Sequence, residues 1–152
     1  MSGWHIAQIN IARFCLPRGS PVNAEFEAAL DEVNATAEAA PGFVWRMIGE
    51  GDNEDGSVFG DPDVTINMTV WESIDHLAAF AYRNLTHRAV MRRRRDWFVD
   101  LPVYLAMWWI RAGSTPSLRD GKAKLDLIAG LGPTPQAFDF RTPFPPPAES
   151  RE

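Results

Sequence analysis

Two segments of the chain, residues 5–14 and 65–71, alternate polar or aromatic side chains with apolar ones. A β-strand places successive side chains on opposite faces of its sheet, so each segment predicts a strand with one apolar face and one polar, aromatic face. Amide, hydroxyl and indole groups on one face can orient a small organic ligand and stabilise negative charge on it. The residues of this face are Gln8, Asn10, Asn67, Thr69 and Trp71.

Two further predicted strands, residues 43–48 and 103–112, add to this face. Arg46 lies in the first of these strands, and burying its charge without a partner would be too costly. It therefore pairs either with a carboxylate such as Glu72 or with an anionic ligand. Each candidate also has a plain structural alternative, since amides can bond loop backbone and tryptophans often pack in a core or an interface. The added ligand-binding candidates are Arg46, Tyr104, Trp108 and Trp109.

His87 is the best titratable candidate, and it lies in a predicted helical segment over residues 86–98. We place it with Asn10 and Trp71 as the candidate catalytic set, with a simple packing role as the alternative. His76 lies eleven positions earlier, which is about 16 Å along one continuous helix at 1.5 Å per residue and too far to share an ion. We therefore predict no metal site.

Composition limits the classes of partner. The chain of 152 residues has a net charge of −5, which argues against nucleic-acid binding. The run Arg92–Arg95 is the exception, and it is either a solvated helix face or a site for an acidic ligand or partner. Cys15 is the only cysteine, the N-terminus has no signal-peptide pattern and no apolar run is long enough for a membrane span. We expect a cytoplasmic protein without membrane contact.

The predicted elements follow the order β-α-β-β-α-β, with a helix over residues 23–40, an acidic loop over 49–63 and a strand over 103–112 that is apolar enough to be central. This order predicts an α+β, ferredoxin-like antiparallel sheet in a domain over 1–114. Residues 115–152 form an extension that packs on the same domain and ends in a Pro-rich tail. If the two helices cover the apolar face, the polar face stays bare, and two chains would pack sheet to sheet as a homodimer.

The chain resembles a bacterial family of unknown function in the dimeric α/β-barrel superfamily, which includes the antibiotic-biosynthesis monooxygenases. The resemblance covers residues 5–141. It rests on the phrases AQIN, PGFVWRM, VWES, MWWIRAG and GLGPTPQAFDF and on the spacing of His87 from RRRDWF.

The resemblance implies a dimer with a small organic ligand in each half-barrel, and we predict no cofactor. A haem-degrading branch of the superfamily uses an Asn, a Trp and a His on elements that correspond to those of Asn10, Trp71 and His87, so haem is an alternative. Our leading hypothesis is a protein that binds an aromatic or polyketide-like molecule and acts as a cofactor-free monooxygenase. A non-catalytic binding module, in which the arginine run and the Pro-rich tail dock a partner, is the other alternative.

Overall fold

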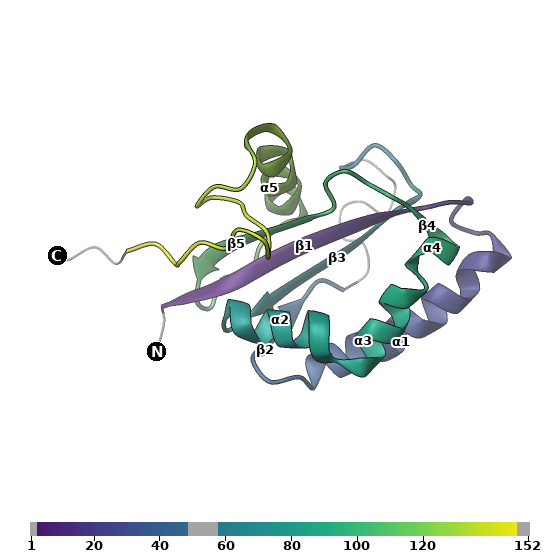
Figure 1. Cartoon of the computed structure of the whole chain (residues 1–152), viewed down its shortest axis with the longest axis horizontal. Coiled ribbons are helices and arrows are strands. Elements are labelled where there is room, and N and C mark those ends of the chain that lie inside the picture. The colour runs from purple at the N-terminus through teal and green to yellow at the C-terminus, as the bar shows by residue number, and fades with distance from the viewer. Residues whose placement is uncertain (1–2, 49–57, 149–152) are drawn as a thin grey trace.

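The computed structural model shows an antiparallel sheet with helices on both faces (Figure 1), and it describes residues 3–48 and 58–148. Residues 49–57, which hold most of the predicted acidic loop, lie outside the described part. The strands are β1 (Trp4–Phe14), β2 (Phe43–Arg46), β3 (Val64–Trp71), β4 (Phe98–Val99) and β5 (Leu105–Arg111). Their order is β2-β3-β1, with β4 and β5 both pairing with the other edge of β1.

Helices α1 to α4 cover one face of the sheet, and α5 covers the other (Figure 1). The chain thus has the predicted α+β, ferredoxin-like fold, with the C-terminal helix added on the opposite face. None of the described helices is both long and apolar enough to cross a bilayer. The bounds are η1 (Pro21–Asn23), α1 (Ala24–Glu38), α2 (Ile74–Arg83), α3 (Leu85–Arg92), α4 (Arg94–Trp97) and α5 (Leu118–Leu131).

Side-chain caps set the helix starts. Ser73 Oγ accepts a hydrogen bond from the His76 backbone N–H at the start of α2, and Asn84 Oδ1 accepts one from the His87 N–H at the start of α3. Ser117 and Asp120 form a capping box at α5. Asn84 itself is extended, so it separates α2 from α3.

The predicted helical segment over residues 86–98 is helical through Trp97, but it is broken at Arg93. The helix ends at Arg92, α4 adds one turn, and Phe98 begins β4. The cause is tertiary packing: Trp97 and Phe98 pack with the aromatic rings of Phe14 on β1 and Phe26 on α1. That contact redirects the chain toward the edge of the sheet.

The prediction of a bare polar face is also wrong. Ile6, at one end of β1, packs with Trp71 and with Leu77 of α2, and Phe14, at the other end, packs with the aromatic residues of α1 and α4. Because even-numbered β1 residues share a face, the polar face is the one that α1 to α4 cover. The sheet-to-sheet argument for a homodimer therefore loses its basis, and the homodimer stays a prediction of the resemblance.

Helix α5 covers the apolar face that the sequence analysis assigned to the other helices. Its Leu118, Leu125 and Ile128 belong to one core cluster with Ile9 and Met68. Contact is so close at Gly121 that a Cβ there would lie 2.7 Å from Ile9 Cδ1. The C-terminal extension therefore completes the core.

Strand β5 is an edge strand, not the central strand that its apolar sequence predicts, because within the described residues its only strand partner is β1. The chain after α5 returns to this edge, where Met107 and Phe138 exchange both backbone hydrogen bonds, at 2.8 and 2.9 Å. Phe138 is fully buried there. The apolar character of β5 is explained by this returning segment, which covers its outer edge.

Candidate functional site

A hydrogen-bonded group of amides and a hydroxyl lies at the centre of the helix-facing side of the sheet. The register of β1 and β3 sets Gln8 opposite Thr69 and Asn10 opposite Asn67. Gln8 Nε2 donates to Thr69 Oγ1 at 2.7 Å and to Asn67 Oδ1 at 2.9 Å. Asn10 Nδ2 donates to Gln8 Oε1 at 3.0 Å and to Asn67 Oδ1 at 3.1 Å. We call these four residues the polar network.

The polar network is satisfied at one end and open at the other. Thr69 Oγ1 also accepts from Trp71 Nε1 at 2.9 Å, and both Gln8 and Thr69 are buried. Asn10 and Asn67 are half-buried, and within the described part of the chain Asn10 Oδ1 and Asn67 Nδ2 have no hydrogen-bond partner. The network therefore offers one acceptor and one donor side by side.

The helix layer makes few contacts with the sheet above this end of the network. The cluster around Leu77 holds α2 against one end of the sheet, and the cluster around Trp97 holds α1 and α4 against the other. Between them α3 packs on α1 and α2, makes few contacts with the sheet and has no buried residue. Asn10 and Asn67 thus lie, half-buried, where the helices pack least closely on the sheet.

An aromatic stack limits the site at its α2 end. The ring of Trp71 stacks on Phe80 with centroids 5.3 Å apart, and the ring of Phe80 contacts His87 at 5.1 Å. Phe43 adds an edge contact, and Trp71 is 0% exposed. The candidate catalytic residues Asn10, Trp71 and His87 are thus brought to one region, although Trp71 can act on a ligand only through Thr69.

His87 has a defined tautomer. Its Nδ1 lies 2.9 Å from the carbonyl oxygen of Ala81, and a carbonyl only accepts, so Nδ1 carries the proton and Nε2 keeps its lone pair. Burial lowers the pKa of His87, and the bond to Ala81 opposes this more weakly. At neutral pH His87 is therefore an uncharged imidazole whose Nε2 can accept a proton.

Haem does not fit these residues in the arrangement that the resemblance implies. Phe80 fills the space between Trp71 and His87, where a macrocycle contacting both would have to lie. The described residues also hold no group of three or more His, Cys, Asp or Glu side chains able to bind a metal ion. We therefore derive no chemistry from haem here.

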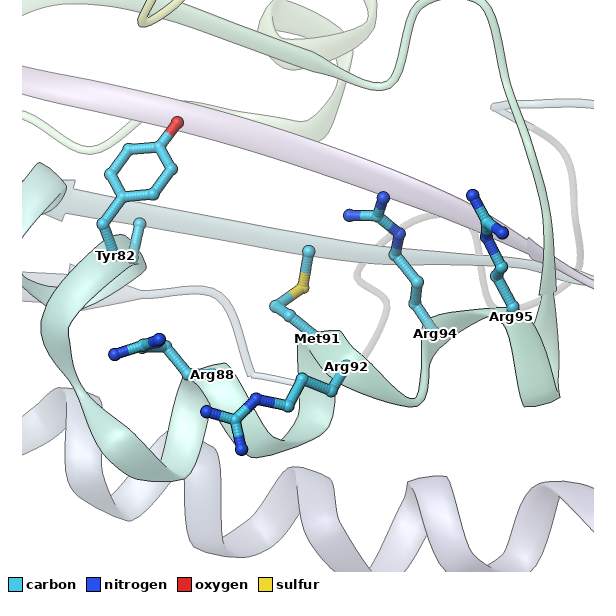
Figure 2. A pocket seen from close by; sticks show the side chains of 7 residues that line it. Tyr82, Arg88, Met91, Arg92, Arg94 and Arg95 are labelled. Carbon is cyan, nitrogen blue, oxygen red and sulfur yellow. The ribbon is translucent and has the colours of Figure 1, made fainter.

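An open concave surface of about 530 Å³ adjoins α3 and α4 (Figure 2). Met91, Arg94 and Arg95 extend from these helices toward β1, whereas Arg92 extends away from it. Met91 follows His87 by one helical turn, so helical spacing places both on the side of the sheet. The residues that line the concavity are Ala81, Tyr82, Arg88, Met91, Arg92, Arg94 and Arg95.

The other predicted ligand residues are scattered. Arg46 lies 3.5 Å from Glu38 of α1, so its carboxylate partner is not Glu72. Trp109 lies on the helix-facing side, where its indole N–H donates to the Phe144 carbonyl oxygen at 2.9 Å. Tyr104 is 52% exposed at the rim. Trp108 is wrongly placed by the prediction, because it points to the opposite face and packs in the α5 core cluster.

Three residues near the site were not predicted from the sequence: Phe80, Ala81 and Tyr82. Their roles depend on the chain turning at Asn84, which brings the end of α2 against His87. The Asn84-Leu85-Thr86-His87 segment is a recognisable helix start, with Asn at the cap position. Reading that cap would have separated α2 from α3 and placed Phe80 and His87 on facing helices.

A match to the family described as "Domain of unknown function (DUF3291)" spans residues 5–152. No curated protein sequence matches the chain. Among solved structures, a protein provisionally described as an antibiotic biosynthesis monooxygenase from Nitrosomonas europaea is 13% identical, with a TM-score of 0.52 over 77% of this chain and 96% of its own.

Two other solved structures are similar. A conserved protein from Methanosarcina mazei Go1 is 9% identical, with a TM-score of 0.51 over 72% of this chain and 93% of its own. A protein of unknown function from Nitrosomonas europaea is 10% identical, with a TM-score of 0.50 over 75% and 94%. At such identities these likenesses establish the fold alone.

Proposed function

We propose a ligand-binding function for this chain, which belongs to the DUF3291 family. The ligand is a small aromatic or polyketide-like molecule that binds between the polar network and α3. The observation that carries this proposal is the open end of the network, where Asn10 Oδ1 and Asn67 Nδ2 lack partners. Half-buried amides on a packed sheet cost stability unless a ligand or water completes their bonds. An acceptor beside a donor suits a hydroxyl or carbonyl group on a ring.

The surrounding side chains suit a flat, apolar ligand. Met91 extends toward β1 across the opening, and the Phe80 ring closes the α2 end. Thioether and aromatic groups pack well on a ring face, and an apolar wall with few polar groups is typical of small-molecule sites. The polar network would then fix the ring's orientation.

The reaction that these residues would support is cofactor-free oxygenation. A phenolic ring with an activated methylene group would lose a proton to His87 Nε2, and the open amide of Asn67 would stabilise the resulting anion. The anion would then react with O₂ to give a hydroperoxide, which loses water to leave a carbonyl group. The balance is one methylene and one O₂ giving one carbonyl and one water. The Nitrosomonas europaea protein that is provisionally described as an antibiotic biosynthesis monooxygenase shares this fold.

The proposal is tested by titrating the protein with 1-naphthol and with an anthrone, following binding by calorimetry and turnover by O₂ uptake. Asn10→Ala should weaken binding about tenfold, the size of one hydrogen bond to a buried group. Gln136→Ala is the matched control, since it removes an exposed amide from a loop outside this face. Equal affinities for both variants and the wild type would contradict the proposal.

O₂ uptake separates the enzyme from the non-catalytic alternative. Turnover that His87→Ala abolishes, with ligand affinity kept, would support the monooxygenase, whereas binding without O₂ uptake would leave a binding protein. The homodimer is a separate prediction, and light scattering at micromolar concentration checks it by giving twice the chain mass.

A further inference from the structure

Four arginines on α3 and α4 have no negatively charged partner among the residues that the structure describes. Arg93, in the middle of the run, is ion-paired with Glu25 and Asp96 and lies over the ring of Trp97 at 4.7 Å. Arg13 on β1 is likewise ion-paired, with Asp61 at 2.7 Å. By contrast, the side chains of four neighbouring arginines make no ion pair or hydrogen bond with any described residue: Arg88, Arg92, Arg94 and Arg95.

This gathering of charge is unexpected in an acidic chain. The chain carries 20 acidic residues against 15 basic ones, so carboxylates are available to pair with these arginines. Instead the four line one concave surface with Tyr82 and Met91 (Figure 2). Adjacent like charges repel, and the arrangement is stabilised when an anion occupies the concavity.

Two of the four arginines face the proposed ligand. Arg94 precedes the buried Trp97 by three positions, so the two residues lie on the same side of α4. Figure 2 shows the side chains of Arg94 and Arg95 extending toward β1. Asn10 lies on the helix-facing side of β1, four residues before Phe14. The ring of Phe14 packs in the same cluster as Trp97. The side chains of Arg94 and Arg95 therefore extend from α4 toward the strand that carries Asn10.

We propose that this concavity is an anion subsite and that the ligand is an aromatic acid, with its ring at the polar network and its carboxylate on Arg94 and Arg95. This inference rests on the proposed function and names its ligand class. A guanidinium presents paired N–H donors in a plane that matches a carboxylate, so two neighbouring forks select a carboxylate over a neutral group.

The test compares 1-hydroxy-2-naphthoate with its neutral isostere 1-hydroxy-2-naphthamide by calorimetry at low salt. The acid should bind at least about tenfold tighter, and raising the salt to about 0.5 M should weaken the acid far more than the amide. In Arg94→Gln/Arg95→Gln the acid should lose this advantage while the amide binds as before. Arg119→Gln, which removes a charge from α5 on the opposite face, is the control and should keep the preference.

The outcomes separate the two proposals. If the acid and the amide bind equally, and both are weakened by Asn10→Ala, the anion subsite is overturned and the proposed function stands. If neither compound binds at millimolar concentration, both proposals are overturned. The acid could also remain preferred in Arg94→Gln/Arg95→Gln, or lose its preference equally in Arg119→Gln. Either result would assign the preference to the net charge of the protein and would also overturn the subsite.

Discussion

The two faces of the sheet are built from the same strands but are completed in different ways. On the α5 face, Ile9, Met68 and their neighbours meet the side chains of α5 in a continuous apolar cluster. On the other face, helices α1, α2 and α4 seal the ends, and the centre holds hydrogen-bonded amides under α3. The α5 face therefore contributes to stability through a continuous apolar core.

The second face is packed less closely by its helices than the first. Asn10 and Asn67 lie at its centre, whereas the centre of the α5 face holds apolar side chains such as Ile9 and Met68. Over these two amides, α3 keeps no buried residue. Polar groups that a fold does not need, in a place where helices leave room, are the usual mark of a binding site.

Neighbouring residues of β1 give the largest test of this contrast. Ile9→Ala removes a fully buried side chain from the α5 face and should lower the free energy of unfolding by about 2–5 kcal/mol, with ligand affinity unchanged. Asn10→Ala should cost about 1 kcal/mol or less, because it removes a half-buried side chain whose own acceptor is unpaired. Urea unfolding measures the stability of each variant, and calorimetric titration measures its ligand affinity. An equal loss of stability at positions 9 and 10 would contradict the difference between the two faces.

Substitution of Thr69, at the satisfied end of the polar network, should lower stability less than Ile9→Ala does. Thr69→Val keeps the shape but leaves the indole N–H of Trp71 without an acceptor, which should cost about 1–3 kcal/mol. Thr36→Val is the control, because the Thr36 hydroxyl bonds only to the Glu32 carbonyl oxygen within α1, and it should change stability by about 0.5 kcal/mol or less. Equal urea midpoints for the two variants would show that Thr69 does not hold the network.

His87 should contribute the smallest effect, visible as a pH dependence. Burial lowers its pKa below the ordinary 6.5, so the unfolded chain binds more protons than the folded chain just below that pH. The contribution of His87 to stability is full above about pH 6.5 and is lost as the pH falls through the lowered folded pKa. Urea midpoints between pH 5 and 7.5 should vary less in His87→Gln, and an unchanged slope would count against a buried neutral imidazole.

The sequence predicted the strands well because their alternation is strict. It also placed Gln8, Asn10, Asn67, Thr69 and Trp71 together on one face, as the register of β1 and β3 confirms. It assigned the wrong helices to that face, since alternation shows that two faces differ but not which layer covers each. Helix α5 lies in a segment outside the β-α-β-β-α-β pattern, and its match to the apolar face depends on distant contacts.

Individual candidate residues were misplaced for the same reason: the sequence does not show which face of the sheet each helix covers. Trp108 and Trp109 are adjacent, and the sequence could not tell which one faces the helices, because a one-residue shift of register exchanges them. The arginine run reads as uniform in sequence, yet Arg93 is paired with α1 and Arg94 extends toward the sheet. The break between α3 and α4 makes that difference.

The central claim is that the helix-facing side of the sheet binds the ligand. It is tested most directly by titrating ¹⁵N-labelled protein with 1-hydroxy-2-naphthoate and following the side-chain N–H signals. The account predicts shifts in the amide signals of Asn10 and Asn67, with the indole signal of Trp108 on the α5 face unmoved. Shifts confined to Trp108, with both amides unchanged at saturation, would contradict it.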